Sequence, residues 1–430
     1  MKNQRLNHGN DAVSFAYEEV DITPQKPMQT IGFGREDEES RGVLGRLLGQ
    51  VSLWKYRKEI CCLIAIDHIG FSKDHCNNLR RAISKTLGVK EQKVMLCFSH
   101  THSAPNDTIE KEYAVFVDNQ IKKAVDSALK KLSPIHEAWG NAYGDIGLNR
   151  RWDSPALDRR IGIFKAVDAK SGELRLLLLR LTAHANVLKA DNYSVSPDYF
   201  GAVRDTLHQR FGCPVMVTQG ASGNVAPKYF ASTLTPPDAG DQRFIRSEQA
   251  MSLMAQEVLE QVSEVIDSME PVPIKRLGMY SLGLDLFADI LPYERAVEIV
   301  NEAKQFVGID GTLWLAEVLR LQKSGVMTQK ETVEIQYFSI GNGCLCGVAN
   351  EIMCEFALRA QALTGNEFFY FGGYTNGCTG YFPTEEEYDK GGYEVYWSML
   401  IYYIYFNRVF PFNRDACTLL IQGAVDNAPL

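Results

Sequence analysis

Two patterns of hydrophobic and polar residues alternate along the first half of the chain. Continuous apolar runs such as 61–69 (CCLIAIDHI) and 93–98 (KVMLCF) predict buried strands. Between these runs, 74–87 has the amphipathic pattern of a helix, and Gly88 follows it as a typical C-cap. The same patterns predict further strands at 161–165, 174–182 and 214–218, and further helices at 113–132, 197–211 and 247–269.

The second half of the chain predicts more helix and a further set of strands. The aromatic run 396–406 is too short to cross a bilayer, so it is interpreted as a buried helix. A loop is predicted at 228–242, which carries two prolines and an AGD turn. The remaining elements are helices at 293–307, 312–324 and 352–363, a hairpin at 331–347 around the turn GNG, and a strand at EFFYF.

No linker, internal repeat or low-complexity segment divides the chain. Alternating strands and helices favour an α/β fold. We therefore predict a large mixed β-sheet flanked by helices, formed as a single catalytic domain over 1–430. The run of helices in the middle of the chain predicts a helical excursion from this domain between 243 and 325.

Composition and charge exclude several classes of protein. The 430 residues include 45 Lys and Arg against 53 Asp and Glu, a net charge of −8, which argues against nucleic-acid binding. With 45% hydrophobic and 23% charged residues, the chain is not broadly disordered. No apolar run is long enough to cross a membrane, and the N-terminus lacks the apolar core of a signal peptide. We therefore expect a cytoplasmic protein without a transmembrane segment, whose oligomeric state stays open.

The ten cysteines predict buried, reduced thiols rather than disulfides. None lies in a CxxC pair, and most lie within apolar runs such as MLCF and CLCG. A structural zinc site built from cysteines is therefore not expected. Any metal site has to use other side chains.

Histidine and glutamate side chains follow several of the predicted strands. His100 and His102 lie in SHTHS directly after 93–98, and alternate residues of an extended segment point to the same side. His184 follows the run LRLLLLRLTA, and Glu351 follows CLCGVAN. In α/β sheets, ligands bind at the carboxyl ends of strands. Histidine and glutamate are ligands of catalytic zinc, which keeps an open position for water. The pattern therefore predicts one zinc ion per chain, bound by two or three histidines and Glu351.

These residues lie in an ordered series of motifs that resembles the neutral/alkaline ceramidase family of zinc-dependent amidases. The most specific motif is SHTHSAP at 99–105. The resemblance implies a zinc-dependent hydrolase that cleaves an amide or ester bond. The other motifs, in chain order, are VDITP (20–24), GFG (32–34), Asn149-Arg150, AHA around His184, SPDY (196–199), QGASGN (219–224), ANE (349–351) and GYTNGCTGY (373–381).

The resemblance implies two sets of functional residues. His102 would contact the scissile carbonyl or its oxyanion, although its spacing from His100 alone would also allow it to be a ligand. One of two adjacent arginines would line the pocket, and both stay candidates. The residues that match the zinc ligands are His100, His184, Glu351 and Tyr381. The residues that match the pocket are His102, Arg150, Arg151 and Tyr393.

One position departs from the family pattern. The ceramidases have a serine before the proline of the glycine-rich turn, proposed as a nucleophile or oxyanion donor, whereas this chain has Ala226. Ser222 is near in sequence but matches a different position. A zinc-activated water would not need the serine. Two alternatives stay open: a zinc-binding protein without catalysis, and a zinc phosphoesterase that uses Asp67 and His68 for a second metal ion.

The resemblance covers a catalytic domain alone. The ceramidases also carry a C-terminal β-sandwich, and the chain ends too early to hold one, so none is expected. The expected partner is a small N-acyl or ester compound, either a lipid or a polar conjugate.

Overall fold

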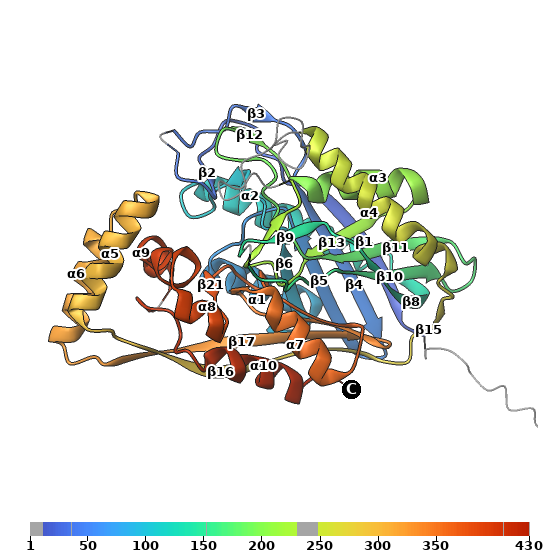
Figure 1. The fold of residues 1–430 in the computed structure, drawn as a ribbon. Helices are drawn as coiled ribbons and strands as arrows, with labels where there is room; N and C mark the ends of the chain where they lie inside the picture. Colours follow the sequence, from blue (N-terminus) through green and yellow to red (C-terminus); the bar gives the residue numbers. More distant parts are fainter. Residues whose placement is uncertain (1–11, 36, 152, 230–247, 407, 430) are drawn as a thin grey trace, which may run out of the picture.

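A nine-stranded mixed sheet lies at the centre of the protein (Figure 1). The computed structural model describes residues 12–35, 37–151, 153–229, 248–406 and 408–429. The strand order is β13–β11–β10–β8–β1–β4–β5–β6, with β15 paired to β8. The pairs β5–β6 and β11–β13 are parallel, and the others are antiparallel. The strands are β1 (Ser14–Asp21), β4 (Leu48–Tyr56), β5 (Glu59–Ile66), β6 (Val94–Phe98), β8 (Ser133–Tyr143), β10 (Arg160–Asp168), β11 (Leu174–Leu181), β13 (Val215–Gln219) and β15 (Val272–Pro273).

Four helices cover one face of this sheet. Side chains of β5 alternate between the two faces, because Cys62 and Ile64 pack with α1 and α2, whereas Cys61 and Leu63 point to the opposite side. Gly88 is the left-handed C-cap of α1, as predicted. The predicted α/β class with a large mixed sheet is thereby confirmed. The helices are α1 (Lys73–Leu87), α2 (Lys111–Ala128), α3 (Tyr199–Phe211) and α4 (Glu248–Ser268).

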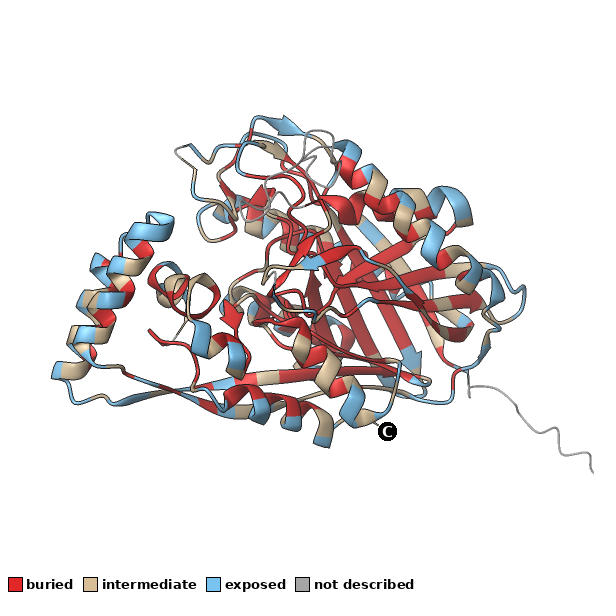
Figure 2. Cartoon of the chain, viewed as in Figure 1, coloured by how far each residue is buried: buried red, intermediate tan, exposed pale blue. Residues whose placement is uncertain are grey.

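A second, four-stranded sheet covers the other face of the large sheet. Apolar side chains of both sheets share one buried cluster, in which Trp54 of β4 contacts Phe164 and Phe338. Helices α7 (Cys354–Thr364) and α10 (Ala416–Asp426) pack outside the second sheet. Helices therefore flank the two-sheet core, and Figure 2 shows their outer faces exposed. The strands, in spatial order, are β16 (Leu277–Asp289), β17 (Thr328–Ile340), β18 (Gly343–Gly347) and β20 (Phe369–Gly372).

The helices α5 (Tyr293–Val307) and α6 (Thr312–Lys323) stand apart from the two sheets, on the left of Figure 1. They follow β16 and precede β17, and they pack through Trp314 against Leu400 and its neighbours. The helical excursion predicted at 243–325 is thus divided. Its first helix, α4, packs on the large sheet, and the long strand β16 separates α4 from α5.

The aromatic run is not the continuous buried helix that was predicted. It forms a π-helical turn η3 (Tyr393–Trp397), the short helix α9 (Met399–Tyr402) and a 3-10 turn η4 (Tyr403–Tyr405). Val395 and Leu400 are buried, but Ile404 is 64% exposed and Tyr405 is 47% exposed. The prediction is wrong for the last turn because this turn borders a solvent-accessible cavity.

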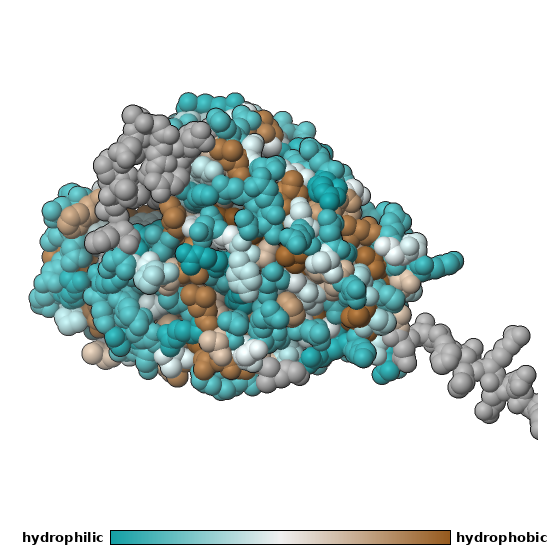
Figure 3. All heavy atoms as spheres, turned by 45° about the vertical axis from the view of Figure 1, so that its right-hand side comes forward, coloured by the Kyte–Doolittle hydropathy of each residue, from teal (hydrophilic) through white to brown (hydrophobic). Residues whose placement is uncertain are grey.

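The cysteine side chains lie mostly in the interior of the protein. All ten cysteines are free; nine are buried and Cys378 is partly exposed. Among the described residues, no helix is both long and apolar enough to cross a membrane. On the face shown in Figure 3, hydrophilic side chains predominate and apolar ones are scattered. Most of the loop predicted at 228–242 lies outside the described residues.

The large sheet twists and curls until its two edge strands lie near each other. Gln219 at the end of β13 donates from Nε2 to the carbonyl oxygen of Ser99 after β6, at 3.1 Å. The same nitrogen donates to the carbonyl oxygen of Ala183 after β11, at 2.8 Å. The segments that follow β6, β11 and β13 therefore meet in one place.

Candidate active site

Three histidines converge where these segments meet. His100 and His102 follow β6, and His184 follows β11. One ring nitrogen of each lies within 4.8 Å of the others. His100 is 2% exposed and His184 is fully buried. His100 has a φ of 62°, a left-handed conformation that is uncommon for a residue with a side chain and tends to occur at functional sites.

Glu351 and Tyr381 reach the same place from a two-stranded ribbon. The strands β19 (Glu351–Ile352) and β21 (Tyr381–Phe382) are parallel, with Glu351 opposite Tyr381. The Tyr381 ring stacks 6.5 Å from the ring of His184. A β-carbon on Gly223 would lie 2.4 Å from the carbonyl oxygen of Glu351, so the glycine-rich turn packs directly against the ribbon. The structure thus brings together the four residues that match the zinc ligands.

Each histidine of the cluster is held by a backbone carbonyl. The Nδ1 atoms of His100, His102 and His184 lie 2.6, 2.8 and 2.6 Å from the carbonyl oxygens of Ile69, Gly32 and Ser222. A carbonyl oxygen can only accept, so each Nδ1 carries the proton. In the neutral rings, each Nε2 therefore presents a lone pair. This is the usual orientation of metal-binding histidines.

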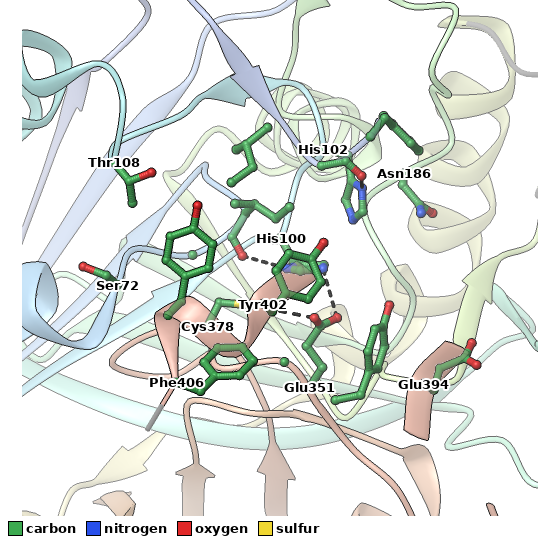
Figure 4. A pocket seen from close by; sticks show the side chains of 18 of the residues that line it. Ser72, His100, His102, Thr108, Asn186, Glu351, Cys378, Glu394, Tyr402 and Phe406 are labelled. Carbon is green, nitrogen blue, oxygen red and sulfur yellow. Dashed lines mark hydrogen bonds and ion pairs between the residues drawn. The ribbon is translucent and has the colours of Figure 1, made fainter. Parts of the chain in front are cut away.

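The lone pairs of two of these rings face a carboxylate. Oε2 of Glu351 lies 3.2 Å from Nε2 of His100 (Figure 4). The same oxygen lies 3.3 Å from Nε2 of His184. Three acceptors at such distances repel one another unless a cation lies between them. The donor set of imidazole nitrogens and carboxylate suits zinc. The residues present therefore fit a metal ion.

Burial and neighbouring charges shift the pKa values of His184, His102 and Glu351 toward the forms that bind a metal. Burial, followed by the charge of Arg150, lowers the pKa of His184 to about 3. Burial and the two neighbouring histidines also hold the pKa of His102 well below its ordinary value. For Glu351, burial raises the pKa, but His100 and His184 outweigh it and hold the pKa well below its ordinary value. Neutral imidazole and ionised carboxylate are the metal-binding forms.

The two candidate arginines point to different places. Arg150 lines the cavity, and its Nη1 donates to the Tyr381 hydroxyl at 3.1 Å and to the Gly223 carbonyl at 3.2 Å. Burial lowers the pKa of Arg150, but Tyr381 and Glu394 outweigh it and raise the pKa, so the charge is retained. Arg151 instead pairs with Glu387 at 2.5 Å and with Glu394 at 3.2 Å. Through these two ion pairs, Arg151 holds Glu387 and the turn η3 in place beside the site.

A cavity of about 450 Å³ borders the cluster. His100, His102, Glu351, Tyr381 and Tyr393 all line it. In Figure 4, Asn186 lies beside His102 on one side, and Ser72 and Thr108 lie on the other. Much of the remaining wall is aromatic: Phe33, Tyr402, Tyr405 and Phe406. The cavity can therefore hold an amphipathic molecule against the histidine–carboxylate cluster.

Two functional candidates were not predicted from the sequence. Asn186 is 4% exposed, lines the cavity, and its Oδ1 has no hydrogen-bond partner in the part of the chain that the structure describes. The spacing His184-Ala185-Asn186 places it two residues after a candidate ligand, a signal comparable to that of His102. Tyr374 is fully buried against the ring of His100. It lies in the motif GYTNGCTGY, which carried no role for this tyrosine.

Three other positions singled out in the sequence, Ala226, Asp67 and His68, have structural contacts. Ala226 lies in β14 (Val225–Pro227), paired with Leu148 of β9 (Gly147–Asn149), and is not among the described residues that line the cavity. Asp67 binds Arg204 through both oxygens, at 2.9 and 2.6 Å. Nε2 of His68 lies 2.7 Å from the carbonyl oxygen of Pro105. The described residues contain no second cluster that could hold a metal ion.

The fold and the site define an α/β protein with a buried histidine–carboxylate cluster that could hold a metal ion beside an aromatic-lined cavity. No family model and no curated protein matches the chain. Among solved structures, the neutral ceramidase from Pseudomonas aeruginosa superimposes with a TM-score of 0.72 at 17% identity, over 98% of this chain and 76% of that chain. A structure described as ceramidase complexed with C2 gives 0.70 at 16% identity, over 97% and 75%. The protein therefore has a neutral ceramidase-like fold, which confirms the resemblance of the motifs at the level of the fold.

Proposed function

We propose that this protein is a zinc-dependent hydrolase that cleaves the amide bond of an N-acyl compound. The observation that carries the proposal is the arrangement of His100, His184 and Glu351. Oε2 of Glu351 lies 3.2 Å from Nε2 of His100 and 3.3 Å from Nε2 of His184, and the Nδ1 proton of each histidine is already donated to a backbone carbonyl. His100, His184, Glu351 and Tyr381 would hold one zinc ion. The chemistry that zinc supplies when bound is a water with a lowered pKa and a polarised carbonyl.

The other residues of the cavity have separate tasks in this proposal. Arg150 keeps its positive charge at the cavity wall, where it orients the substrate carbonyl and offsets negative charge on its oxygen. Tyr393 lines the same wall, and its ring lies 5.9 Å from that of Tyr381. His102 presents an unprotonated Nε2, so it accepts a proton from the attacking water instead of donating to the oxyanion.

Asn186 supports an amide over an ester as the substrate. Its Oδ1 is a buried acceptor without a partner among the described residues, which is a costly arrangement unless a ligand donates to it. The N–H of a secondary amide is such a donor, and an ester has none. The aromatic wall and the ceramidase neighbours support a lipid amide as the substrate class.

The serine that the ceramidases have at the position of Ala226 is not needed for the proposed hydrolysis. Ala226 is buried in the β14–β9 pair, and hydrolysis by water needs no side-chain nucleophile at that position. A phosphoesterase with two metal ions has less support, because Arg204 already binds Asp67.

Chelation tests the proposal directly. Purified protein is assayed on N-acyl amines of several acyl lengths, including a short-chain ceramide, before and after removal of metal. We expect the rate to vanish on removal and to return with Zn²⁺. Undiminished hydrolysis after complete metal removal would rule the proposal out. Zinc binding without turnover of any substrate would instead identify a binding protein that has lost catalysis.

A further inference from the structure

We propose that Ser222 and Tyr374 form a positioning pair that holds Glu351 and His184 in the arrangement required for metal binding. This inference rests on the proposed metal-dependent function. It assigns a task to two motif residues that have no role in the chemistry itself.

The pair forms a directed chain of hydrogen bonds to the carboxylate. The Tyr374 hydroxyl lies 3.4 Å from Oε2 of Glu351, and a carboxylate oxygen can only accept, so Tyr374 donates. The phenolic oxygen then accepts from Oγ of Ser222 at 3.1 Å. The oxygen that Tyr374 contacts is the same one that faces His100 and His184. Both residues are fully buried, so water does not compete for these bonds.

The same two residues also touch the histidines. The backbone carbonyl of Ser222 accepts from Nδ1 of His184 at 2.6 Å. The Tyr374 ring lies 4.3 Å from the ring of His100, with an angle of 39° between the planes. Ser222 and Tyr374 therefore contact three candidate ligands from the side away from the substrate.

The backbone of Tyr374 links two of the segments that carry ligands. Its carbonyl accepts from the amide of Phe98, two residues before His100, at 3.0 Å. Its amide donates to the carbonyl of Asn350, the residue before Glu351, at 3.4 Å. Tyr374 adopts a φ of 55°, a left-handed conformation that surrounding contacts have to maintain. The tyrosine is thus held in an unusual conformation at the point where it can reach Glu351.

Neither residue is among the described residues that line the cavity. A role in substrate contact is therefore not supported, and their effect on the reaction has to pass through the ligands. Partners that orient metal ligands typically change metal affinity about 10- to 100-fold when removed.

The test measures zinc affinity by competition with a chromophoric chelator, using the full chain. Tyr374→Phe removes one oxygen atom, and we expect the zinc Kd to rise at least about 10-fold. Ser222→Ala should raise it less. The double variant should match Tyr374→Phe, because the Ser222 hydroxyl acts only through the phenol. The control is Tyr370→Phe, which removes a buried hydroxyl that bonds Asn141 at 2.7 Å, and it should leave the Kd unchanged.

Thermal unfolding of the metal-free variants separates positioning from folding. We expect the metal-free melting temperatures of Tyr374→Phe and Tyr370→Phe to be similar while only the former loses zinc affinity. Wild-type affinity in Tyr374→Phe, or losses that multiply in the double variant, would overturn the inference. If Tyr374→Phe does not fold, Ser222→Ala decides, and an unchanged Kd overturns it. A wild-type protein that binds no zinc would overturn the proposed function instead.

Discussion

The buried Oδ1 atom of Asn186 is the reason we expect a preference for substrates that have an amide N–H. Asn186→Leu keeps a similar volume and removes the acceptor. We expect kcat/KM for a secondary amide to fall about 10-fold or more, which corresponds to about 1.4 kcal/mol, while its N-methyl amide, which has no N–H, changes little. Steady-state kinetics of the wild type and Asn186→Leu on these two substrates measure the change in kcat/KM for each amide. An equal loss on both amides would contradict the assignment.

His75 should couple the stability of the protein to pH. Its two ring nitrogens lie 2.8 Å from Asp107 and 3.0 Å from Asp118. Burial lowers the pKa of His75, but the two carboxylates outweigh it and raise the pKa to about 9. A raised pKa in the folded state contributes stability that is fully present below about pH 6.5 and is lost as the pH rises through about 9.

The His75→Gln variant isolates this contribution. The difference in unfolding free energy between wild type and His75→Gln should be largest near pH 6, up to about 3 kcal/mol from the size of the pKa shift, and should shrink by pH 10. Urea denaturation across this range measures it. A difference that stays constant or grows with pH would show that His75 is not held protonated by its carboxylates.

At the scale of residues, the sequence indicates which side chains could bind a metal. It does not show which distant segments these side chains contact. That His100, His184 and Glu351 lie close together could be predicted, because side chains able to bind a metal are unusual at the ends of buried strands. Arg150 and Arg151 could not be separated, because their orientation depends on the pairing of β9 with β14, where the Arg150 amide donates to the Asn224 carbonyl at 2.7 Å. Tyr374 could not be assigned a role, because its contacts join segments far apart in the chain.

At the scale of elements, the close approach of the glycine-rich turn to β19 is open to test. Gly223→Ala places a β-carbon 2.4 Å from the Glu351 carbonyl oxygen, so β19 has to shift. We expect the variant to lose about 1–3 kcal/mol of stability and to bind zinc more weakly. The control is Gly278→Ala in β16, where a β-carbon meets no atom within 4 Å, and it should change stability by at most about 0.5 kcal/mol.

Calorimetric unfolding and zinc titration check both glycine variants. Wild-type zinc affinity in Gly223→Ala would show that the position of β19 does not set the metal site. A large loss in Gly278→Ala would show that the control region is itself sensitive.

Elements with a clear apolar or amphipathic pattern were predicted within a few residues of their observed bounds, as β6 and α1 show. The strand β16 was missed because much of it is exposed and its sequence contains two glycines and two aspartates, which weaken a strand pattern. The buried helix predicted at 396–406 was wrong for the opposite reason. Its aromatic residues indicated burial, but several of them form the wall and mouth of the cavity.

At the scale of the whole molecule, the α/β class and the mixed sheet followed from the alternation of patterns, but the packing of one sheet on another did not. Strands buried on both faces have the same continuous apolar pattern whether a helix or a sheet covers them. The convergence of the site depends on the curl of the nine-stranded sheet, which brings β6 and β13 together. No local pattern in the sequence encodes that long-range closure.

Metal content tests the central claim, that His100, His184 and Glu351 hold one zinc ion per chain. Elemental analysis is made on the purified wild type and on His184→Ala, Glu351→Ala and His102→Ala, each after dialysis with zinc. We expect about one zinc per chain in the wild type and in His102→Ala, and almost none in the other two variants. A wild type without zinc, or full occupancy in His184→Ala and Glu351→Ala, would contradict it.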